Sequence, residues 1–495
     1  MQPDCSAIAS SPAASRAESM NIARPIATPV RLTGPAALRW GLRLAREPLM
    51  ATRQCFEAHG GFVVLADALP FVRPRGVALL GVPLVLTAGA AFHGELLSDP
   101  ATWRGVSLLP GGPRGSAARR IGAGLTRMTG RRHTYYRSLI GPALRKASIE
   151  ALTARMATLA QAEVESWRTD EPLELWELTR RLMRKMAMEL LFGGDPESYR
   201  IADLVSRLME GKWSRGAFIP VNLPITPYGR IVRAAEVLER RLIDWIASKR
   251  GARDDHDLGS IIINNPDADG TQPSDEAIAG QLPSLFAAAS EASQSALTFT
   301  LLLLALHPRA AGELYEELRG RQGGAPPTLE EASGLACIDS AVKEAMRILP
   351  PVPLQIRVAQ SDAAIAGHAV PKGTRVMLNT FLVNRMPDLY PDGDSFRPER
   401  WRTIAPSAYE FPVFSGGPHA CPGYWFGLAS VKIALAAILM RYHVLLERDA
   451  RIDYRVQPTM RPLKALRVTL DCEAGAGTVV PVTGTLLNLL KLPPS

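Results

Sequence analysis

The sequence of 495 residues has few cysteines and few aromatic side chains, and no apolar run in it is long enough to cross a membrane. Its longest apolar stretch, 76–92, is interrupted by Gly81 and Pro83. We therefore interpret it as a hairpin of buried strands, with the turn inside 76–89. The cysteines are odd in number and far apart, and they include no CxxC pair, which argues against a disulfide framework or a zinc site and indicates a reducing compartment. They are Cys5, Cys55, Cys337, Cys421 and Cys472.

Acidic residues are missing from the stretch 111–146, which carries nine basic residues. A solvated basic surface is the plain interpretation. A nucleic-acid interface is disfavoured by the interleaved glycines and by the lack of a recognised DNA-binding motif. His133 and Arg137 lie four residues apart in this stretch, so they share one face of a helix. The basic residues are Arg114, Arg119, Arg120, Arg127, Arg131, Arg132, Arg137, Arg145 and Lys146.

The composition and the ends of the chain suggest how it is organised. With 47% hydrophobic and 21% charged residues the chain is an ordinary globular protein, and its length alone predicts about three domains. Residues 1–33 are rich in Ser, Ala and Pro without a periodic pattern, so they predict a disordered leader, and no signal peptide is evident. Residues 476–495 form an extension whose apolar TLLNLLKL either packs on the body or contacts a membrane.

The stretch 411–427, FPVFSGGPHACPGYWFG, places Cys421 in a loop rich in glycine and proline just before an apolar helical run. Because only the thiolate form of cysteine binds a metal well, a metal site here must depress the pKa of Cys421. Gly416, Gly417 and Gly423 allow a tight turn and a close approach to a large planar ligand. The alternative is a buried structural cysteine before a helix.

Five positions of this loop fit the pattern Phe-x-x-Gly-x-(Arg or His)-x-Cys-x-Gly, and the loop resembles the haem-ligand loop of the cytochrome P450 family. They are Phe414, Gly417, His419, Cys421 and Gly423. The resemblance implies haem b bound through Cys421, with Phe414 against the macrocycle and His419 at a propionate. It also implies that His133, Arg137 and Arg357 hold the propionates.

A second resemblance falls on a long helix predicted from Ser274 to about Leu306. Its middle, Ala288-Ala289-Ser290-Glu291-Ala292-Ser293, is similar to the family's oxygen-binding segment (Ala/Gly)-Gly-x-(Asp/Glu)-Thr-Thr. A lone carboxylate in an apolar helix is costly to bury, so Glu291 is either at the surface or functional. Ala292 replaces the threonine that helps to deliver protons in the family. Proton delivery would then depend on Ser293, a water or a hydroxyl group of the substrate.

Two further motifs follow in the family's order. Glu344 and Arg347 precede a proline-rich stretch, and FRPERW supplies Arg400; the resemblance implies that these three form a charge network beneath the haem loop. The resemblance also places Ala288, Ala289, Val352, Pro353 and Leu354 in the substrate pocket. The apolar stretch 213–229 corresponds to the family's lid over the substrate channel, with an ordinary packed loop as the alternative.

These motifs run across one uninterrupted region, so we expect a single domain over 34–475, mainly α with a small β-rich portion, of the cytochrome P450 fold and soluble bacterial type. The implied activity is insertion of one oxygen atom from O2 into a small, largely apolar substrate. Its electrons would come from NAD(P)H through a separate reductase and a ferredoxin or flavodoxin. The alternatives are a peroxygenase, an isomerase or dehydratase, and a non-enzymatic haem or ligand binder. We expect a cytoplasmic monomer without nucleic acid or a transmembrane segment, with weak peripheral membrane contact as an alternative.

Overall fold

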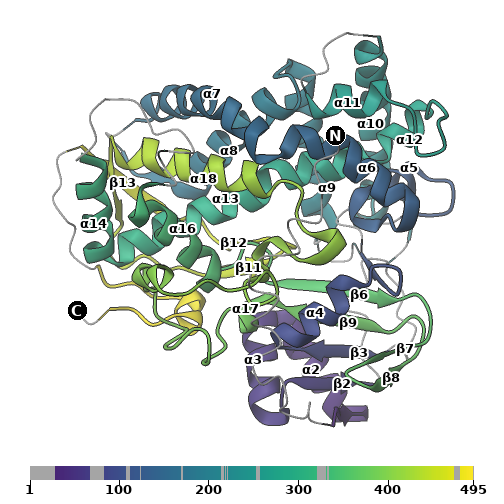
Figure 1. Ribbon diagram of the computed structural model, residues 1–495, viewed down its shortest axis with the longest axis horizontal. Coiled ribbons are helices and arrows are strands. Elements are labelled where there is room, and N and C mark those ends of the chain that lie inside the picture. The colour runs from purple at the N-terminus through teal and green to yellow at the C-terminus, as the bar shows by residue number, and fades with distance from the viewer. Residues whose placement is uncertain are drawn as a thin grey trace, which may run out of the picture.

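The computed structural model describes residues 28–66, 83–106, 112–122, 124–168, 171–212, 214, 217, 219, 221–251, 257–319, 331, 334–472 and 480–493. Helices fill most of the molecule, and a six-stranded sheet lies at one end (Figure 1). The predicted fold class, mainly α with a smaller β-rich portion, is confirmed. The division of the chain into leader, single domain and extension stays a prediction.

The helical part is built around α13, Leu282–Leu306, which runs through its centre (Figure 1). Its second half is buried on all sides, because its leucines pack against neighbouring helices and its hydroxyls bond locally or across to α8. The helices of this part are α5 Ala117–Arg120, α6 Gly130–Leu144, α7 Lys146–Glu165, α8 Leu175–Leu191, α9 Pro196–Lys212, α10 Pro227–Lys249, α11 Leu258–Asn264, α12 Asp275–Ala279, α13, α14 Pro308–Arg319, α16 Ala336–Ile348 and α18 Tyr424–Leu439.

The long helix predicted from Ser274 is interrupted. Ser274 caps α12, where its Oγ accepts the Ala277 N–H at 3.3 Å, but α12 ends at Ala279 and α13 begins at Leu282, next to Pro283. Proline lacks an N–H and is tolerated only in the first turn of a helix, so it starts a second helix here instead of bending one. Within the described residues, 275–306 is the one helical stretch long and apolar enough to cross a membrane, but most of it is buried in the protein core.

The six-stranded sheet has the order β1-β2-β3-β9-β6-β4. Val30 and Leu32 lie in β1 and are ordered, so this part of the predicted leader is a strand; residues 1–27 lie outside the described residues. The predicted hairpin within 76–89 is only partly described: its strand at 84–87 pairs antiparallel with 62–65 and parallel with 375–379. The strands are β1 Val30–Leu32, β2 Phe62–Leu65, β3 Leu84–Thr87, β4 Trp103–Gly105, β6 Leu354–Ala359 and β9 Arg375–Asn379.

Three helices cover the sheet. Helices α2, Gly34–Arg46, and α3, Pro48–His59, bury one face through residues such as Trp40 and Leu44. Helix α4, Ala90–Ser98, packs its Phe92, Leu96 and Leu97 on the other face, between the sheet and the cysteine loop. The small sheets and short helices are β5 Leu173–Glu174, β7 Ala363–Ile365, β8 His368–Val370, β10 His443–Leu446, β11 Tyr454–Val456, β12 Met460–Pro462, β13 Arg467–Asp471, α17 Thr380–Val383, and the 3₁₀ turns η3 Leu125–Arg127, η4 Pro398–Arg402, η5 Pro412–Phe414, η6 Gly417–His419 and η7 Thr485–Leu489.

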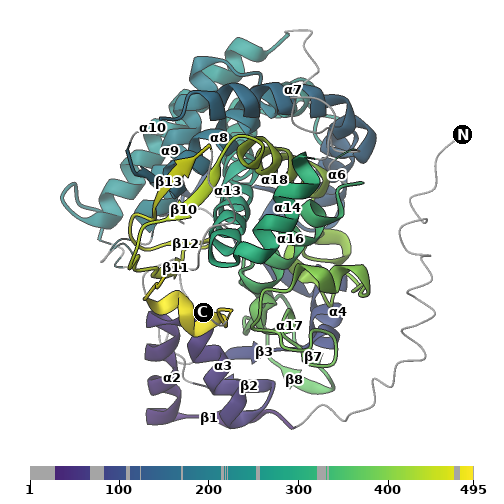
Figure 2. The same ribbon diagram turned by 90° about the vertical axis from the view of Figure 1, so that its left-hand side faces the viewer.

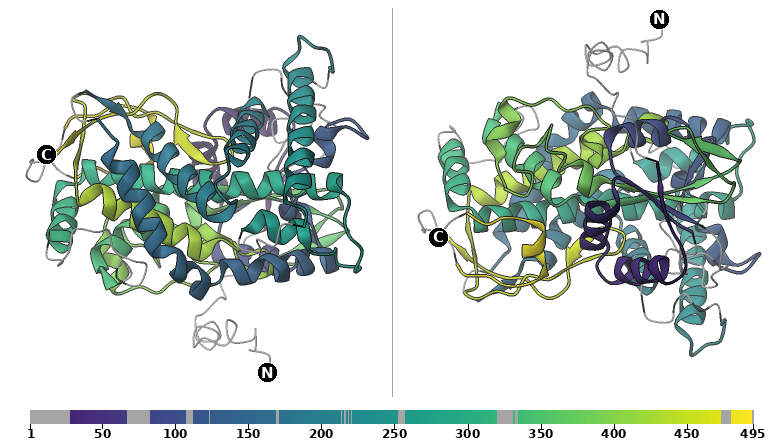
Figure 3. Two further views of the ribbon diagram at one scale, coloured as in Figure 1. Left: turned by 90° about the horizontal axis from the view of Figure 1, so that it is seen from above. Right: turned by 90° about the horizontal axis from the view of Figure 1, so that it is seen from below.

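The C-terminal extension packs on the body. Leu486, Leu489 and Leu490 are buried, and the Leu489 carbonyl accepts the Arg385 Nη2 donor at 2.9 Å. Figures 2 and 3 show this segment in yellow beside the N-terminal helices in purple. Of the two alternatives drawn from the sequence, packing on the body is therefore the one observed.

Candidate active site

The cysteine loop is held by backbone geometry that the sequence makes possible. The Cys421 N–H donates to the Phe414 carbonyl at 2.8 Å, which closes the loop between η5 and α18. Gly417 has a φ of +62°, and a Cβ there would overlap the Leu97 carbonyl at the end of α4. Only glycine fits such a position without strain. Ser415 also has a positive φ, of +60°, in a conformation that side chains other than glycine rarely adopt.

The Cys421 thiol is accessible to solvent, although it lies deep among protein atoms. Burial raises its pKa, while the Gly423 N–H and the positive charge of Arg137 act in the opposite direction. Without a metal ion, the desolvation of the thiolate outweighs both stabilising groups. A metal ion that coordinates the sulfur would supply the missing stabilisation. Gly423 caps α18, as expected for a helix that starts next to the sulfur.

Around the cysteine loop, donors and cations gather without an acidic partner among the described residues. His133 and His419 stack with ring centroids 3.9 Å apart, and the Arg137 Nη1 donates to the Ala420 carbonyl at 2.7 Å. Burial, together with the charges of His133, Arg357 and Arg137, lowers the pKa of His419 to about 4. Burial also lowers the pKa of Arg357 to about 10.

Sequence reasoning missed His93 on α4. Its Nδ1 lies 3.1 Å from the Gly89 carbonyl, so Nδ1 carries the proton and Nε2 is an acceptor, buried and without a partner in the part of the chain described. Burial, with a smaller effect from the charge of Arg357, lowers the pKa of His93 to about 4, against the opposing hydrogen bond to Gly89. A single histidine in a short apolar helix gave no signal in the sequence.

These groups fit a planar ligand that carries two carboxylates. Arg357 makes only long contacts, at 3.3 Å, with Ile356 and Gln355, and the His419 Nε2 is buried and unpaired within the described residues. Buried cations and orphaned donors are costly unless anions satisfy them. Cys421 as a soft thiolate ligand beside such a cradle is the donor set of an iron porphyrin with propionate side chains.

The middle of α13, where the resemblance places part of the substrate pocket, is accessible. Ala288 is exposed and Ala289, Ser290, Glu291 and Ala292 are half-buried, although the helix on either side of them is buried. An accessible stretch in the centre of a core helix means that this turn faces a cavity. The pKa of Glu291 is raised to about 7, mainly by burial and also by the charge of Glu210, while the charge of Arg461 opposes the rise.

The remaining predicted cavity residues differ from one another in burial and orientation. Ser293 is buried and faces α18, since a methyl group added at Gly427 would lie 3.7 Å from its Oγ. It therefore points away from the wall that Ala292 lines. Val352 and Leu354 are half-buried, whereas Pro353 is buried with its carbonyl bonded to the Phe381 N–H at 3.2 Å.

The three members of the charge network meet at one carboxylate. Arg347 donates to both Glu344 oxygens at 2.8 Å, and the Arg400 Nε donates to Oε1 at 2.9 Å. Glu344 also accepts the Arg397 N–H and the Trp401 Nε1, each at 2.9 Å, which the sequence motif did not indicate. Glu344 and Arg347 are fully buried, so this network fixes α16 to the segment that leads into the cysteine loop.

The fold and the cysteine with its cradle define a haem-thiolate protein. The family model for cytochrome P450 matches residues 113–466, so the chain belongs to the cytochrome P450 family. Proteins of this family bind haem b through a cysteine thiolate and act as monooxygenases, and both statements hold for this chain.

Individual relatives agree with this assignment. The chain is 27% identical over 408 residues to cyclooctat-9-en-7-ol 5-monooxygenase of Streptomyces melanosporofaciens, covering 75% of this chain and 88% of that protein. It is 29% identical over 361 residues to pentalenene oxygenase of Streptomyces avermitilis, covering 70% and 80%. The structure of retinoic acid bound cyanobacterial CYP120A1 matches with a TM-score of 0.74 at 22% identity, covering 90% of this chain and 99% of that one.

Proposed function

We propose that this monooxygenase oxidises a cyclic, mostly hydrocarbon substrate of the kind that terpenoids provide. The observation that carries the proposal is the accessible turn of α13, 288–292, which exposes alanines in the middle of a core helix. This turn would face the haem side of Cys421. Two relatives are named for pentalenene and for a cyclic alkenol. Apolar residues on the stretch between α9 and α10, including Ile219, Leu223 and Ile225, are exposed and would form an apolar lid.

The residues of the site would have different roles in binding the haem. Cys421 would hold the iron, Phe414 would lie against the macrocycle, and His133, Arg137, Arg357 and His419 would hold the propionates. When bound, the haem supplies the activation of O2. The protein would orient the substrate against the α13 wall and exclude bulk water.

Proton supply is assigned to the Glu291 carboxyl, whose pKa of about 7 suits a group that gains and loses protons at neutral pH. Ala292 offers no hydroxyl, so the last donor would be a water or a polar group of the substrate. Ser293 is a weaker candidate, because it faces α18.

Electrons would arrive through a ferredoxin or flavodoxin that docks beside the cysteine loop, in a cytoplasmic enzyme. Arg137 contacts the loop directly, and the Lys146 Nζ lies 5.6 Å from the centre of the Trp425 ring on α18. Exposed Arg131, Arg132 and Arg145 extend this basic surface, which suits an acidic protein carrier.

The test is turnover of a panel of mono-, sesqui- and diterpene hydrocarbons, alcohols and acids by the purified protein with O2, NADPH and a ferredoxin–reductase pair. We expect a product that gains one oxygen atom from labelled O2, and a carbon monoxide difference spectrum of the thiolate type that Cys421→Ser abolishes. Product formed with peroxide alone, and none with O2 and donor, would contradict the proposal in favour of a peroxygenase.

A further inference from the structure

The hairpin of β11 and β12 places two arginines beside the substrate cavity. Arg455 and Arg461 are directly opposite each other in the antiparallel register, so their side chains leave the same face of the hairpin. The Ser295 Oγ on α13 donates to the Met460 carbonyl at 2.6 Å, one turn beyond Glu291. The Met460 N–H donates to the Pro351 carbonyl at 2.8 Å, next to the predicted cavity residues 352–354. The hairpin is therefore fixed between two walls of the cavity.

The two like charges are poorly compensated. The Arg461 side chain is 11% exposed; its Nη1 bonds the Glu210 carboxylate and its Nη2 bonds the Gln457 amide oxygen, both at 3.0 Å. The Nε atoms of Arg455 and Arg461 are both buried without a hydrogen-bond partner among the residues described. Arg455 has no ion pair within that part of the chain. The surrounding acids are Glu210, whose side chain is 60% exposed, and Glu291.

Glu291 does little to cancel this positive charge. Its pKa of about 7 leaves it substantially protonated at neutral pH. Burial lowers the pKa of Arg455, and the charge of Arg461 lowers it further, while Glu210 raises it. Two guanidiniums share one exposed carboxylate beside an apolar wall, so a positive charge is left over there. Arg455 is half-buried and Arg461 is nearly buried, so both guanidiniums are partly desolvated and would bind an anion that enters the cavity.

We propose that the substrate carries a carboxylate, which pairs with Arg455 while its hydrocarbon skeleton extends along α13 toward Cys421. The Nε and one Nη of Arg455 form a planar fork that has no hydrogen-bond partner among the described residues, and this fork matches the two oxygens of a carboxylate. The Arg461 Nε adds a third donor, whereas its two Nη atoms are already occupied. The proposal rests on the proposed function and narrows its substrate class to acids.

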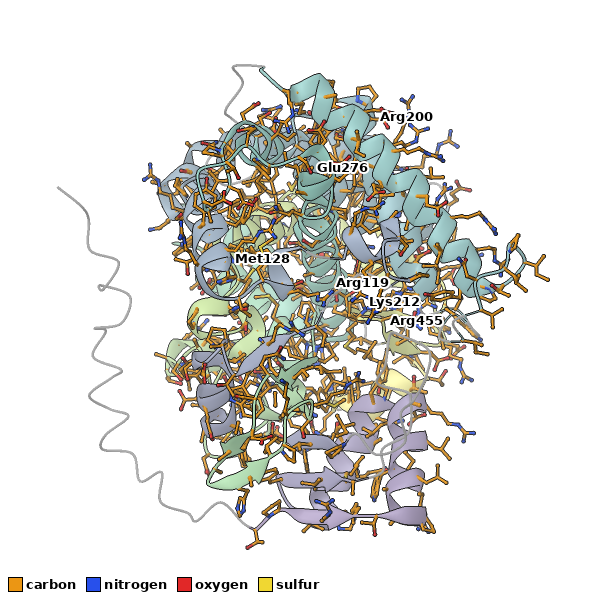
Figure 4. All side chains as sticks on the ribbon, turned by 90° about the vertical axis from the view of Figure 1, so that its right-hand side faces the viewer. Arg119, Met128, Arg200, Lys212, Glu276 and Arg455 are labelled. Carbon is orange, nitrogen blue, oxygen red and sulfur yellow. The ribbon has the colours of Figure 1, made fainter. Side chains whose placement is uncertain are left out.

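The position of Arg455 suits a residue that binds the substrate carboxylate at the outer end of the cavity, and we call this carboxylate-binding group the anchor. Figure 4 shows Arg455 and Lys212, the last residue of α9, at the level where the helical part meets the six-stranded sheet. A carboxylate held there would leave the distal part of the substrate to reach the cysteine loop. Arg461, through its bond to Glu210 in the last turn of α9, joins this anchor to the end of α9.

The experiment measures dissociation constants by the spin-state change of the ferric holoenzyme for matched acids, methyl esters and alcohols on mono-, sesqui- and diterpene skeletons. For at least one skeleton we expect the acid to bind about 10- to 100-fold more tightly than its ester, as for a hydrogen-bonded charge pair. Arg455→Gln should reduce the acid to the affinity of the ester and leave the ester unchanged, and Arg455→Lys should keep part of the preference. The control is Arg451→Gln, since Arg451 lies near the hairpin but already pairs with Asp453 at 2.8 Å.

Three results would overturn the proposal. The first is equal binding of acid and ester in every set, and the second is failure of all acids to bind. The third is an unchanged preference for the acid in Arg455→Gln when that variant keeps its thiolate spectrum. If the Gln variant does not bind haem, a preference of the Lys variant equal to that of the wild type would overturn it instead. The proposed function fails separately. If the enzyme oxidises esters or alcohols and does not bind acids more tightly, only the proposal of a substrate carboxylate is refuted. If acids bind tightly but give no O2-dependent product, only the proposed monooxygenation of such skeletons is refuted.

Discussion

At the scale of single residues, Glu291 is a group on α13 whose charge changes near neutral pH. It lies on the accessible turn of α13, and burial raises its pKa from 4.5 to about 7. The folded protein therefore holds a proton that the unfolded chain releases between these two pH values. The carboxyl costs no stability below about pH 4.5 and becomes progressively more destabilising as the pH rises through 7.

We predict that Glu291→Gln is more stable than the wild type at pH 8 by on the order of 2 kcal/mol, and that the difference disappears toward pH 4.5. Chemical denaturation of the ferric holoenzyme across this pH range measures the effect. Glu316→Gln on α14 is the control, because that side chain is 75% exposed. A difference between Gln and Glu at position 291 that is constant with pH would contradict the raised pKa.

A second prediction at this scale concerns Ala292 and the amount of product formed per NADPH. With a substrate that has no polar group near the reacting carbon, Ala292→Thr should increase product formed per NADPH consumed by roughly 2- to 10-fold, because a positioned hydroxyl assists proton transfer. Ala292→Val has a similar volume without the hydroxyl and serves as the control. The measurement is product against NADPH consumption. If Thr and Val behave alike, this turn does not act in proton delivery.

At the scale of elements, the Glu344 carboxylate holds α16, η4 and the approach to the cysteine loop together. Five donors converge on its two oxygens, and neither Glu344 nor Arg347 reaches solvent. The sequence motif with its fixed i, i+3 spacing predicted the two helical members, and FRPERW predicted Arg400. The donors from Arg397 and Trp401 depend on how the chain folds back over some fifty residues, which short-range spacing does not encode.

We predict that Glu344→Ala lowers the free energy of unfolding by about 3–5 kcal/mol, because two guanidiniums are left buried without a counter-charge. Haem retention and thermal unfolding of the purified variant measure this loss. Glu399→Ala is the matched control, since Glu399 lies in η4 with its side chain 51% exposed and should change stability by less than about 1 kcal/mol. Similar stabilities for the two variants would show that the network is not structural.

The cysteine loop, like the charge network, could be predicted from short-range spacing in the sequence. In the loop, the positions that approach neighbouring backbone closely require glycine. The break between α12 and α13 could not be predicted in this way, because Pro283 both ends and begins helices and its neighbours decide between the two. The opposition of Arg455 and Arg461 depends on hairpin register, and the burial of His93 depends on how α4 packs against the sheet. Such features arise only from contacts between separate elements.

At the scale of the whole molecule, the C-terminal extension belongs to the folded body. Leu489 is fully buried, and its carbonyl is one of the acceptors for Arg385, a guanidinium whose pKa burial lowers to about 9. The Arg385 Nε donates to Asp394 at 2.9 Å, so the extension completes a buried cationic site and does not merely lie on the surface.

We predict that Leu489→Ala destabilises the protein by about 2–5 kcal/mol, as is typical for a leucine removed from a core. Asn488→Ala, at the exposed neighbouring position, should be neutral within about 0.5 kcal/mol. Both are measured by denaturant unfolding of the holoenzyme. A neutral Leu489→Ala would mean that the extension is dispensable for folding.

The pairing of β3 with β9 joins segments about 290 residues apart in the chain. A ribosome adds roughly 5–20 residues per second, so β3 waits on the order of 15 to 60 seconds before its parallel neighbour is synthesised. During that time the apolar edge of β1, β2 and β3 has only α2, α3 and α4 to cover it. Nascent chains of this protein should therefore depend on chaperones that shield exposed strands until the last quarter of the chain leaves the ribosome.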